Sequence, residues 1–431
     1  MSAVVEKSPQ SLEADQRFNF IACLIDAVGW PVGMAFFSMT TVIPLFMGYL
    51  KANNSLIGSL VAIVNLLTFL PGCMMVGYIS KLARARGYLL LVGLGERFAF
   101  VPLIPLTLLW GRSHPGWLLA ALFGAFIGNA FLMGLNQPSY WIVLGKCVPV
   151  SRRGRLFGLA GGIGGVLGIA VDGCLRTLLN GKTGGFPTGF AEVFAIGFVV
   201  MAVTILPLGF VRESVSGPRS EEDPHSGHYW RDSKTVWQQN AGFRSFLFSQ
   251  VPSSFIGIAA PFFVLYAGRH LYAPTSSVAE YTAVLVLAGS FGSVLWGTMS
   301  DMKGNKLVLL SGSFCSFLAS VCALFITSPV LFTVVFLLSA LGTAAVGLAG
   351  NNITLEYAAR DRDIPLYVAM YNLAMALPRA AAPLIGGILA DRAGGYGLVF
   401  ILSSLIAAAS VVLSLTIREP RHTNAMQIGV R

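Results

Sequence analysis

Six charged side chains lie well inside the long apolar runs of this 431-residue sequence, away from the ends of the runs, and they are the first candidates for chemistry. Three are acids and three are bases: Asp26, Glu96, Arg97, Asp172, Arg176 and Arg379. A charge inside an apolar segment of membrane length is costly, so it marks a functional site or is neutralised by a partner. Three acids and three bases can neutralise one another, which is the structural alternative at every position.

Asp26 is the strongest single candidate for carrying a proton. It lies in the first apolar run, where Pro31 and two flanking glycines predict a bent or locally unwound helix. The matching part of the seventh run holds Gln250, followed by Pro252. Interrupted helices at corresponding positions of two halves indicate a binding site. The alternative for Asp26 is a structural hydrogen bond to a neighbouring helix.

Arg379 is a candidate for binding an anion. It lies mid-run between Pro378 and Pro383, and no acid lies within one helical turn of it. Its partner must therefore be a ligand or an acid on another helix, such as Asp26 or Asp172. A guanidinium that faces a cavity would favour an anionic solute.

The remaining charged residues form two sequence pairs. Asp172 and Arg176 are four residues apart, so they share one helix face and can pair, either to lower the cost of insertion or to form an outer gate. Glu96 and Arg97 are adjacent, and adjacent helical residues do not face each other. We expect that pair to serve packing or pairing between helices.

Uncharged polar residues gather in the fourth and tenth runs. These substrate-binding candidates are Asn129, Asn136, Gln137, Tyr140, Asn351 and Asn352. The two adjacent amide pairs, Asn136 with Gln137 and Asn351 with Asn352, are 215 residues apart. Amides in these runs either bind a polar solute or join helices by hydrogen bonds, which is common in membranes.

The elements that position these residues are membrane-spanning helices. Hydrophobic residues make up 55% of the chain and charged residues 11%, too few to cover a soluble protein of this size. The apolar runs show no period-two alternation, which excludes membrane strands. The twelve predicted spans are 18–48, 55–79, 88–110, 117–145, 156–180, 190–211, 245–268, 278–300, 306–328, 330–355, 366–390 and 397–417.

The basic residues set the predicted orientation. The side that carries both termini holds 21 Lys and Arg, the opposite side holds five, and three lie inside spans. Cytoplasmic loops are enriched in Lys and Arg, so both termini are expected in the cytoplasm. The net charge of +10 is therefore topological and does not indicate nucleic-acid binding. Short loops and a short tail favour a bacterial inner membrane.

The chain divides into two halves of six spans. A polar linker at 212–242, which ends in a segment compatible with a short interfacial helix, separates predicted bundles at 17–211 and 243–418. Cytoplasmic tails are predicted at 1–16 and 419–431.

A short loop pattern occurs in both halves. The second copy follows the eighth span and contains Gly297, Asp301, Gly304 and Lys306; the first copy, 220 residues earlier, has Lys81 in place of the acid. Gly297 permits close helix approach, and Gly304 suits a tight turn. Asp301 is placed to cap a neighbouring helix N-terminus.

The second loop resembles the signature loop of the major facilitator superfamily. Twelve spans, cytoplasmic termini, the central linker and a stretch from Pro383 to Asp391 are also similar to that family. The resemblance implies an all-α fold of two six-helix bundles that rock around a central site, lined by spans 1, 2, 4, 5, 7, 8, 10 and 11.

A cytoplasmic lock follows from the pseudo-symmetry. Asp301 is expected to approach the start of the fifth helix, where Arg153 and Arg155 lie, and to hold the cytoplasmic side shut. These residues, with the glycines and lysine of the loop and the pair Asp172 and Arg176, are the gating candidates.

The function predicted is secondary active transport of a small solute, coupled to protons through Asp26. The alternatives are an uncoupled facilitator and a transporter-like receptor or assembly factor without turnover. The sequence has no Walker loop, no Cys/His metal cluster and no nucleophile elbow, so no enzyme activity, cofactor or metal is predicted. The expected partners are the solute, protons and the lipid bilayer, with the monomer as the working unit.

Overall fold

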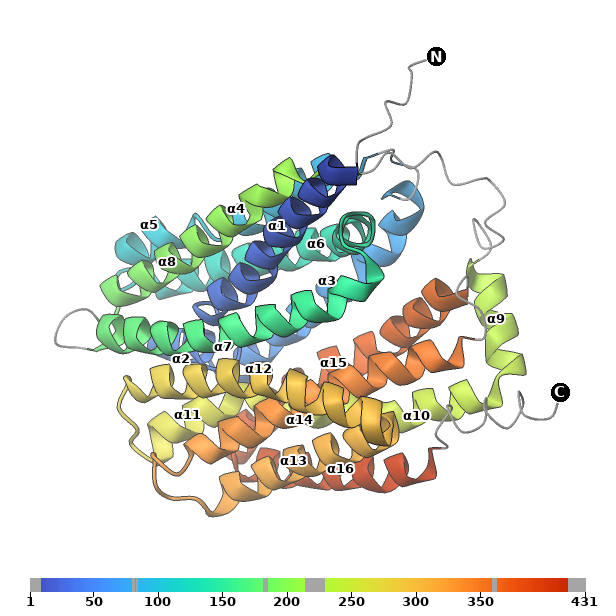
Figure 1. The fold of residues 1–431 in the computed structure, drawn as a ribbon. Coiled ribbons are helices and arrows are strands. Elements are labelled where there is room, and N and C mark those ends of the chain that lie inside the picture. The colour runs from blue at the N-terminus through green and yellow to red at the C-terminus, as the bar shows by residue number, and fades with distance from the viewer. Residues whose placement is uncertain are drawn as a thin grey trace.

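The computed structural model describes residues 9–79, 82, 84–180, 185–213, 229–358 and 363–417. Over these residues the fold is built from helices arranged in two groups (Figure 1). The first group contains α1 to α8, and the second contains α10 to α16. The predicted all-α fold of two bundles is confirmed.

The first bundle runs to residue 213. Its helices are α1 Pro9–Ala35, α2 Val42–Tyr49, α3 Asn54–Ile79, α4 Arg86–Phe98, α5 Leu103–Trp110, α6 Pro115–Cys147, α7 Val150–Leu179 and α8 Thr188–Ile205, followed by the 3-10 turn η1 Leu206–Phe210.

The second bundle follows the linker helix α9 Tyr229–Gln239. Its helices are α10 Ala241–Phe255, α11 Ala260–His270, α12 Ser277–Lys303, α13 Asn305–Phe325, α14 Thr333–Tyr357, α15 Ile364–Ala393 and α16 Gly397–Thr416, with the 3-10 turn η2 Ile256–Ile258 between α10 and α11.

Eleven segments in the described part of the chain are long and apolar enough to cross a membrane, and a shorter apolar stretch, Asn54–Phe69, lies within the predicted second span. The protein is therefore an integral membrane protein. Three predicted spans are broken in the structure. The first divides between α1 and α2, the third divides before Pro102, and the seventh divides at η2 before Pro261. Proline lacks an N–H and cannot continue the hydrogen-bond ladder of the preceding turn, which explains the breaks in the third and seventh spans.

Two predicted boundaries also change. Helix α1 begins at Pro9, inside the segment predicted as a polar tail, and α10 begins at Ala241, inside the predicted linker. The helix predicted at the end of the linker is α9, whose polar and apolar residues lie on opposite faces. In both cases the helix extends beyond its apolar run, because hydropathy locates the membrane-buried part of a helix rather than its ends.

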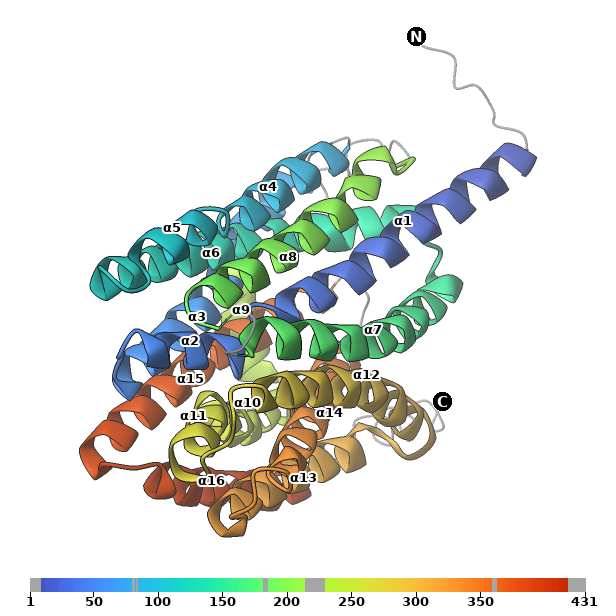
Figure 2. The same cartoon turned by 90° about the vertical axis from the view of Figure 1, so that its left-hand side faces the viewer.

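The first turn of α1 and the last turn of α16 lie at the same end of the molecule, which we call the termini end (Figure 1). The opposite end, the far end, carries Lys51 between α2 and α3 and Tyr272 between α11 and α12. The bundles meet along two helix pairs, α3 with α15 and α7 with α12 (Figure 2). We call the surface between these pairs the seam.

The backbones approach closely in the far-end half of the seam. A Cβ added at Gly58 of α3 would lie 2.1 Å from the carbonyl oxygen of Pro383, and one at Gly387 of α15 would lie 2.3 Å from that of Asn54. Only glycine fits such approaches. The stretch from Pro383 to Asp391, singled out by its sequence, thus lies against the first bundle.

Candidate functional site

A buried cluster inside the first bundle contains two carboxylates and one guanidinium. The Arg97 guanidinium lies 3.1 Å from the Asp26 carboxylate and 3.6 Å from that of Glu96. All three residues are at most 4% exposed. An ion pair taken out of water is stable only when its remaining polar atoms are also satisfied.

Arg97 meets that condition through the backbone. Its Nε donates to the carbonyl of Met201 on α8, its Nη1 donates to the carbonyl of Gly93, and its Cζ lies 4.7 Å from the centre of the Trp30 ring. Arg97 therefore joins α1, α4 and α8. The expected pairing between helices is present, because Arg97 contacts Asp26 of α1. Glu96 and Arg97 also approach each other, because the long arginine side chain folds back along α4 toward Gly93.

The amides of the fourth span complete this cluster. Asn136 donates to the Glu96 carboxylate over 3.3 Å, and Asn129 donates to the Glu96 carbonyl over 2.9 Å. Ser139 in turn donates to the side-chain oxygen of Asn136. Of the two alternatives for these asparagines, the contacts match the joining of helices. Asp26 likewise has the structural partner that the alternative reading required.

A second cluster lies at the seam, around Arg379 at the middle of α15. Its Nη2 donates to the Tyr371 hydroxyl over 3.2 Å, and its Cζ lies 5.3 Å from the centre of the Phe69 ring on α3. Asn65 of α3 donates to the Arg379 carbonyl. Among the described residues no carboxylate lies within ion-pair distance of the guanidinium. The suggested pairing with Asp26 or Asp172 is wrong, because those acids pair with Arg97 and Arg176.

Gln250 of α10 lies beside this second cluster. It is 1% exposed, and within the described part of the chain neither its amide nitrogen nor its amide oxygen has a hydrogen-bond partner. A Cβ added at Gly350 of α14 would lie 2.3 Å from the Tyr371 hydroxyl and 3.6 Å from the Gln250 amide oxygen. Glycine at 350 thus leaves room for Tyr371 to approach Gln250. We call Gln250, Gly350, Tyr371 and Arg379, with Phe69 opposite, the seam site.

The other amide candidates do not join the seam site. Asn352 donates to the side-chain oxygen of Asn305 near the termini end, whereas Asn351 is exposed. Gln137 is half-buried, and Tyr140 packs edge-on against Trp141.

At the far end, Asp391 of α15 caps a helix of the opposite bundle. Its carboxylate accepts hydrogen bonds from the backbone N–H groups of Asn54 and Ser55, the first two residues of α3, and from both of their side chains. Tyr396 donates to the Asn54 side chain and accepts from Arg269. An acid satisfies the unpaired N–H groups at a helix N-terminus and opposes the positive end of the helix dipole. We call this arrangement the Asp391 latch.

A second far-end contact uses the predicted gating pair. Arg176 lies 3.2 Å from Asp172 on the same helix and 3.2 Å from Glu280 on α12. The predicted pairing of Asp172 with Arg176 is confirmed, and Glu280 extends it across the seam.

The termini end lacks the expected lock in this structure. Asp301 is exposed and, among the described residues, makes no hydrogen bond or ion pair. Arg155 is exposed, and Arg153 donates to the carbonyls of Val148 and Gly145 at the end of α6. Asp301 therefore caps no helix here.

In the rest of the signature loop, the predicted turn at Gly304 is present and the predicted close helix approach at Gly297 is not. Gly304 has a φ of 88°, as expected for a tight turn, and Lys306 donates to the carbonyl of Leu415 at the end of α16. A Cβ at Gly297 would meet no atom of the described residues within 4 Å, so the predicted close approach of another helix at Gly297 is wrong for this structure. Lys81 lies outside the described residues.

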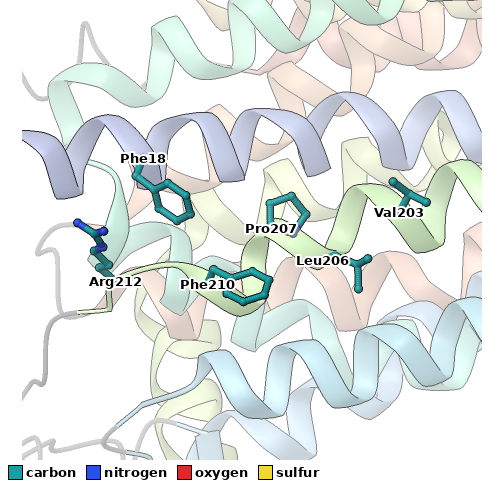
Figure 3. A pocket seen from close by; sticks show the side chains of 6 residues that line it. All are labelled: Phe18, Val203, Leu206, Pro207, Phe210 and Arg212. Carbon is teal, nitrogen blue, oxygen red and sulfur yellow. The ribbon is translucent and has the colours of Figure 1, made fainter.

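Two surface hollows lie away from the seam site. The larger, about 620 Å³, lies between α1 and the end of α8 in the first bundle (Figure 3). Phe18, Phe210 and Arg212 are among its lining side chains. The smaller, about 280 Å³, includes Asp391 and Tyr396 of the latch. Neither contains a candidate binding residue of the seam site.

Comparisons with known proteins agree with the architecture. Residues 246–429 match the family model described as Major Facilitator Superfamily. The second bundle is thus similar to that family. An uncharacterized MFS-type transporter of Methanocaldococcus jannaschii is 26% identical over 139 residues, 32% of this chain and 36% of that protein. The chain thus matches only about a third of the length of this curated relative.

Solved structures of two transporters share the fold over nearly the whole chain. A D-xylose-proton symporter has a TM-score of 0.67 at 14% identity, covering 95% of this chain and 98% of that one. A bacterial homolog of the human lysosomal transporter Spinster, inward-facing and unoccupied, has a TM-score of 0.61 at 15% identity, with coverages of 95% and 98%.

Several site residues were not identified from the sequence. Asp391 was noted only as part of a family-like stretch, and Glu280 and Gly350 were not singled out. Glu280 and Asp391 lie at the ends of apolar runs, where charges are unremarkable. Only the packing of one bundle against the other gives them partners.

Proposed function

We propose that this protein is a secondary active transporter of a small solute that works by alternating access between two bundles. The observation that carries the proposal is the distribution of contacts along the seam. The Asp391 latch and the Arg176–Glu280 pair lie at the far end, and the contacts of Asn65 and Phe69 with Arg379 lie midway along α3 and α15. Beyond that midpoint, toward the termini end, Asp301 and Leu377 are exposed.

A structure held together at one end and open at the other is one of the two states that alternating access requires. With both termini in the cytoplasm, as the charge distribution predicts, the state is inward-open. Among the described residues, the contacts of Arg379 are the hydrogen bond and ring contact between α3 and α15 nearest the termini end, so we expect a solute bound at the seam site to be reached from the cytoplasm.

We further propose that the Asp26–Glu96–Arg97 cluster carries the coupled proton. Two carboxyl groups share one guanidinium, so full ionisation leaves one buried negative charge without a counter-charge. One proton bound by the two carboxyl groups would balance the charge of the cluster. The cluster joins α1, α4 and α8, so a proton there would change how the helices of the first bundle pack. This extends the predicted role of Asp26 to a pair of acids.

The pH dependence of the two states tests both proposals without a known solute. Spin-label pairs at Arg155 with Met302 and at Lys51 with Tyr272, all exposed, report the termini end and the far end. Double electron–electron resonance should find two populations, with opposite changes at the two ends, whose ratio changes between about pH 5 and 9.

Variants then test whether Asp26 and Glu96 carry the coupled proton. Asp26→Asn and Glu96→Gln should each flatten the pH dependence, whereas Glu192→Gln, which alters an exposed acid, should leave it unchanged. Populations that do not respond to pH in the unmodified protein would remove proton coupling and leave the facilitator alternative. A single population at both ends would remove alternating access and favour the receptor alternative.

A further inference from the structure

The charge balance of the membrane-embedded residues distinguishes anionic from cationic solutes. Asp26 and Glu96 are committed to Arg97, and Asp172 is committed to Arg176. None of these acids belongs to the seam site, where a cationic solute would need a carboxylate. Arg379 is different, because its charge has only neutral neighbours among the described residues.

The neutral neighbours of Arg379 leave much of its hydrogen-bonding capacity unused. A guanidinium has five N–H donors, and among the described residues one of them has an acceptor, the Tyr371 hydroxyl. The rings of Phe69 and Tyr371 lie 5.3 Å and 5.5 Å from its Cζ. Such contacts attract a cation to aromatic faces but satisfy no N–H donor. The fork of the guanidinium matches the geometry of a planar carboxylate.

Gln250 provides the second, independent observation. A buried amide with both polar atoms unpaired is costly and is rare in stable proteins. Its oxygen lies on the same side of Gly350 as the Tyr371 hydroxyl, which Arg379 contacts. The Tyr371 hydroxyl thus lies near two groups with unused hydrogen-bonding capacity among the described residues, the Gln250 amide and the Arg379 guanidinium.

We propose that the seam site binds a small aromatic acid, with the carboxylate on Arg379 and Tyr371, the ring against Phe69, and a polar substituent within reach of Gln250. This assignment rests on the proposed transport function and names its substrate class. Because Phe69 belongs to α3 and Arg379 to α15, the ligand would contact both bundles. It would neutralise the charge of Arg379, which has no acidic partner among the described residues.

Matched ligand pairs test the charge preference. Binding of benzoate and benzamide to the purified full-length protein is measured by calorimetry, with benzylamine as the cationic probe. Benzoate should bind at least about tenfold more tightly than benzamide, and benzylamine should not bind. Equal affinities for benzoate and benzamide, preference for benzylamine, or no binding of any of the three would overturn the assignment.

Variants test whether Arg379 is the source of the preference for benzoate over benzamide. Arg379→Gln should reduce the benzoate-to-benzamide ratio to within about twofold, and Arg379→Lys should retain part of it, because lysine keeps the charge but not the fork. Arg392→Gln, which removes an exposed arginine of the same helix, should leave the ratio unchanged. An unchanged ratio in a folded Arg379→Gln protein places the anion elsewhere and overturns the site. Thermal unfolding of each variant establishes that it is folded.

The two levels of the proposal fail separately. The pH-dependent populations at the two ends need no ligand, so they report alternating access even if benzoate does not bind. Conversely, benzoate binding that depends on Arg379 in a protein with one fixed conformation would support the site and contradict transport.

Discussion

The Asp391 latch predicts that a single acid holds the far end closed. Its carboxylate accepts four hydrogen bonds from Asn54 and Ser55 of the opposite bundle, two of them from backbone N–H groups. Asp391→Ala removes all four. The fold of each bundle should survive, because the lost contacts lie between the bundles rather than within them.

The magnitude follows from the loss of a helix cap. Removing a capping side chain costs about 0.5–2 kcal/mol. The interaction of an exposed acid with the helix dipole adds about 0.3–1 kcal/mol. Asp391 is exposed to solvent, which screens its charge. The expected cost to the state closed at the far end is therefore about 1–2 kcal/mol, which changes the ratio of the two states roughly 5- to 30-fold.

Double electron–electron resonance between labels at Lys51 and Tyr272 measures this ratio. In Asp391→Ala the long-distance population at the far end should grow, and the pair at Arg155 and Met302 should show a matching short-distance population. Arg392→Gln, one residue along α15, is the control and should leave both distributions unchanged. Unchanged distributions in Asp391→Ala would refute the reasoning, because the latch would then contribute nothing to closing the far end.

Three further predictions concern Asp301, Gly350 and Arg97. Asp301→Asn should shift the populations toward the inward-open state, opposite to Asp391→Ala, if Asp301 forms its lock only when the termini end closes; unchanged side-specific cysteine labelling would remove that lock. Gly350→Ala should destabilise the protein by about 1–3 kcal/mol in thermal unfolding, because the new methyl group would overlap the Tyr371 hydroxyl. Gly347→Ala, where a Cβ meets no atom within 4 Å, is its control. Arg97→Gln should lower stability by about 3–5 kcal/mol, because it leaves two buried carboxyl groups without a counter-charge; a melting temperature within a degree of the unmodified protein would contradict the buried pairing.

The sequence predicted the two bundles because each membrane span needs about 20 apolar residues, and such runs are visible without any tertiary information. It also predicted the pair of Asp172 and Arg176, since four residues along one helix determine their contact. The positive φ of Gly304 followed from the turn that the loop requires.

The partners of residues on different helices were not predictable in the same way. Asp26 pairs with Arg97 across 71 positions, and Asp391 contacts Asn54 across 337. These contacts depend on which helix faces which neighbour, and a helix that is apolar all round carries no periodic signal of that. Because Asp26 and Asp172 pair with Arg97 and Arg176, Arg379 has no acidic partner among the described residues. The sequence alone could not show which arginine would lack such a partner.

Transport in sealed vesicles tests the central claim most directly. Solutes that raise the melting temperature of the purified protein are supplied to proteoliposomes with and without an imposed pH gradient. At least one such solute should accumulate above its equilibrium level, and collapsing the gradient with a proton ionophore should abolish the accumulation. The contradicting result is that these solutes bind the protein but cross its vesicles no faster than protein-free vesicles.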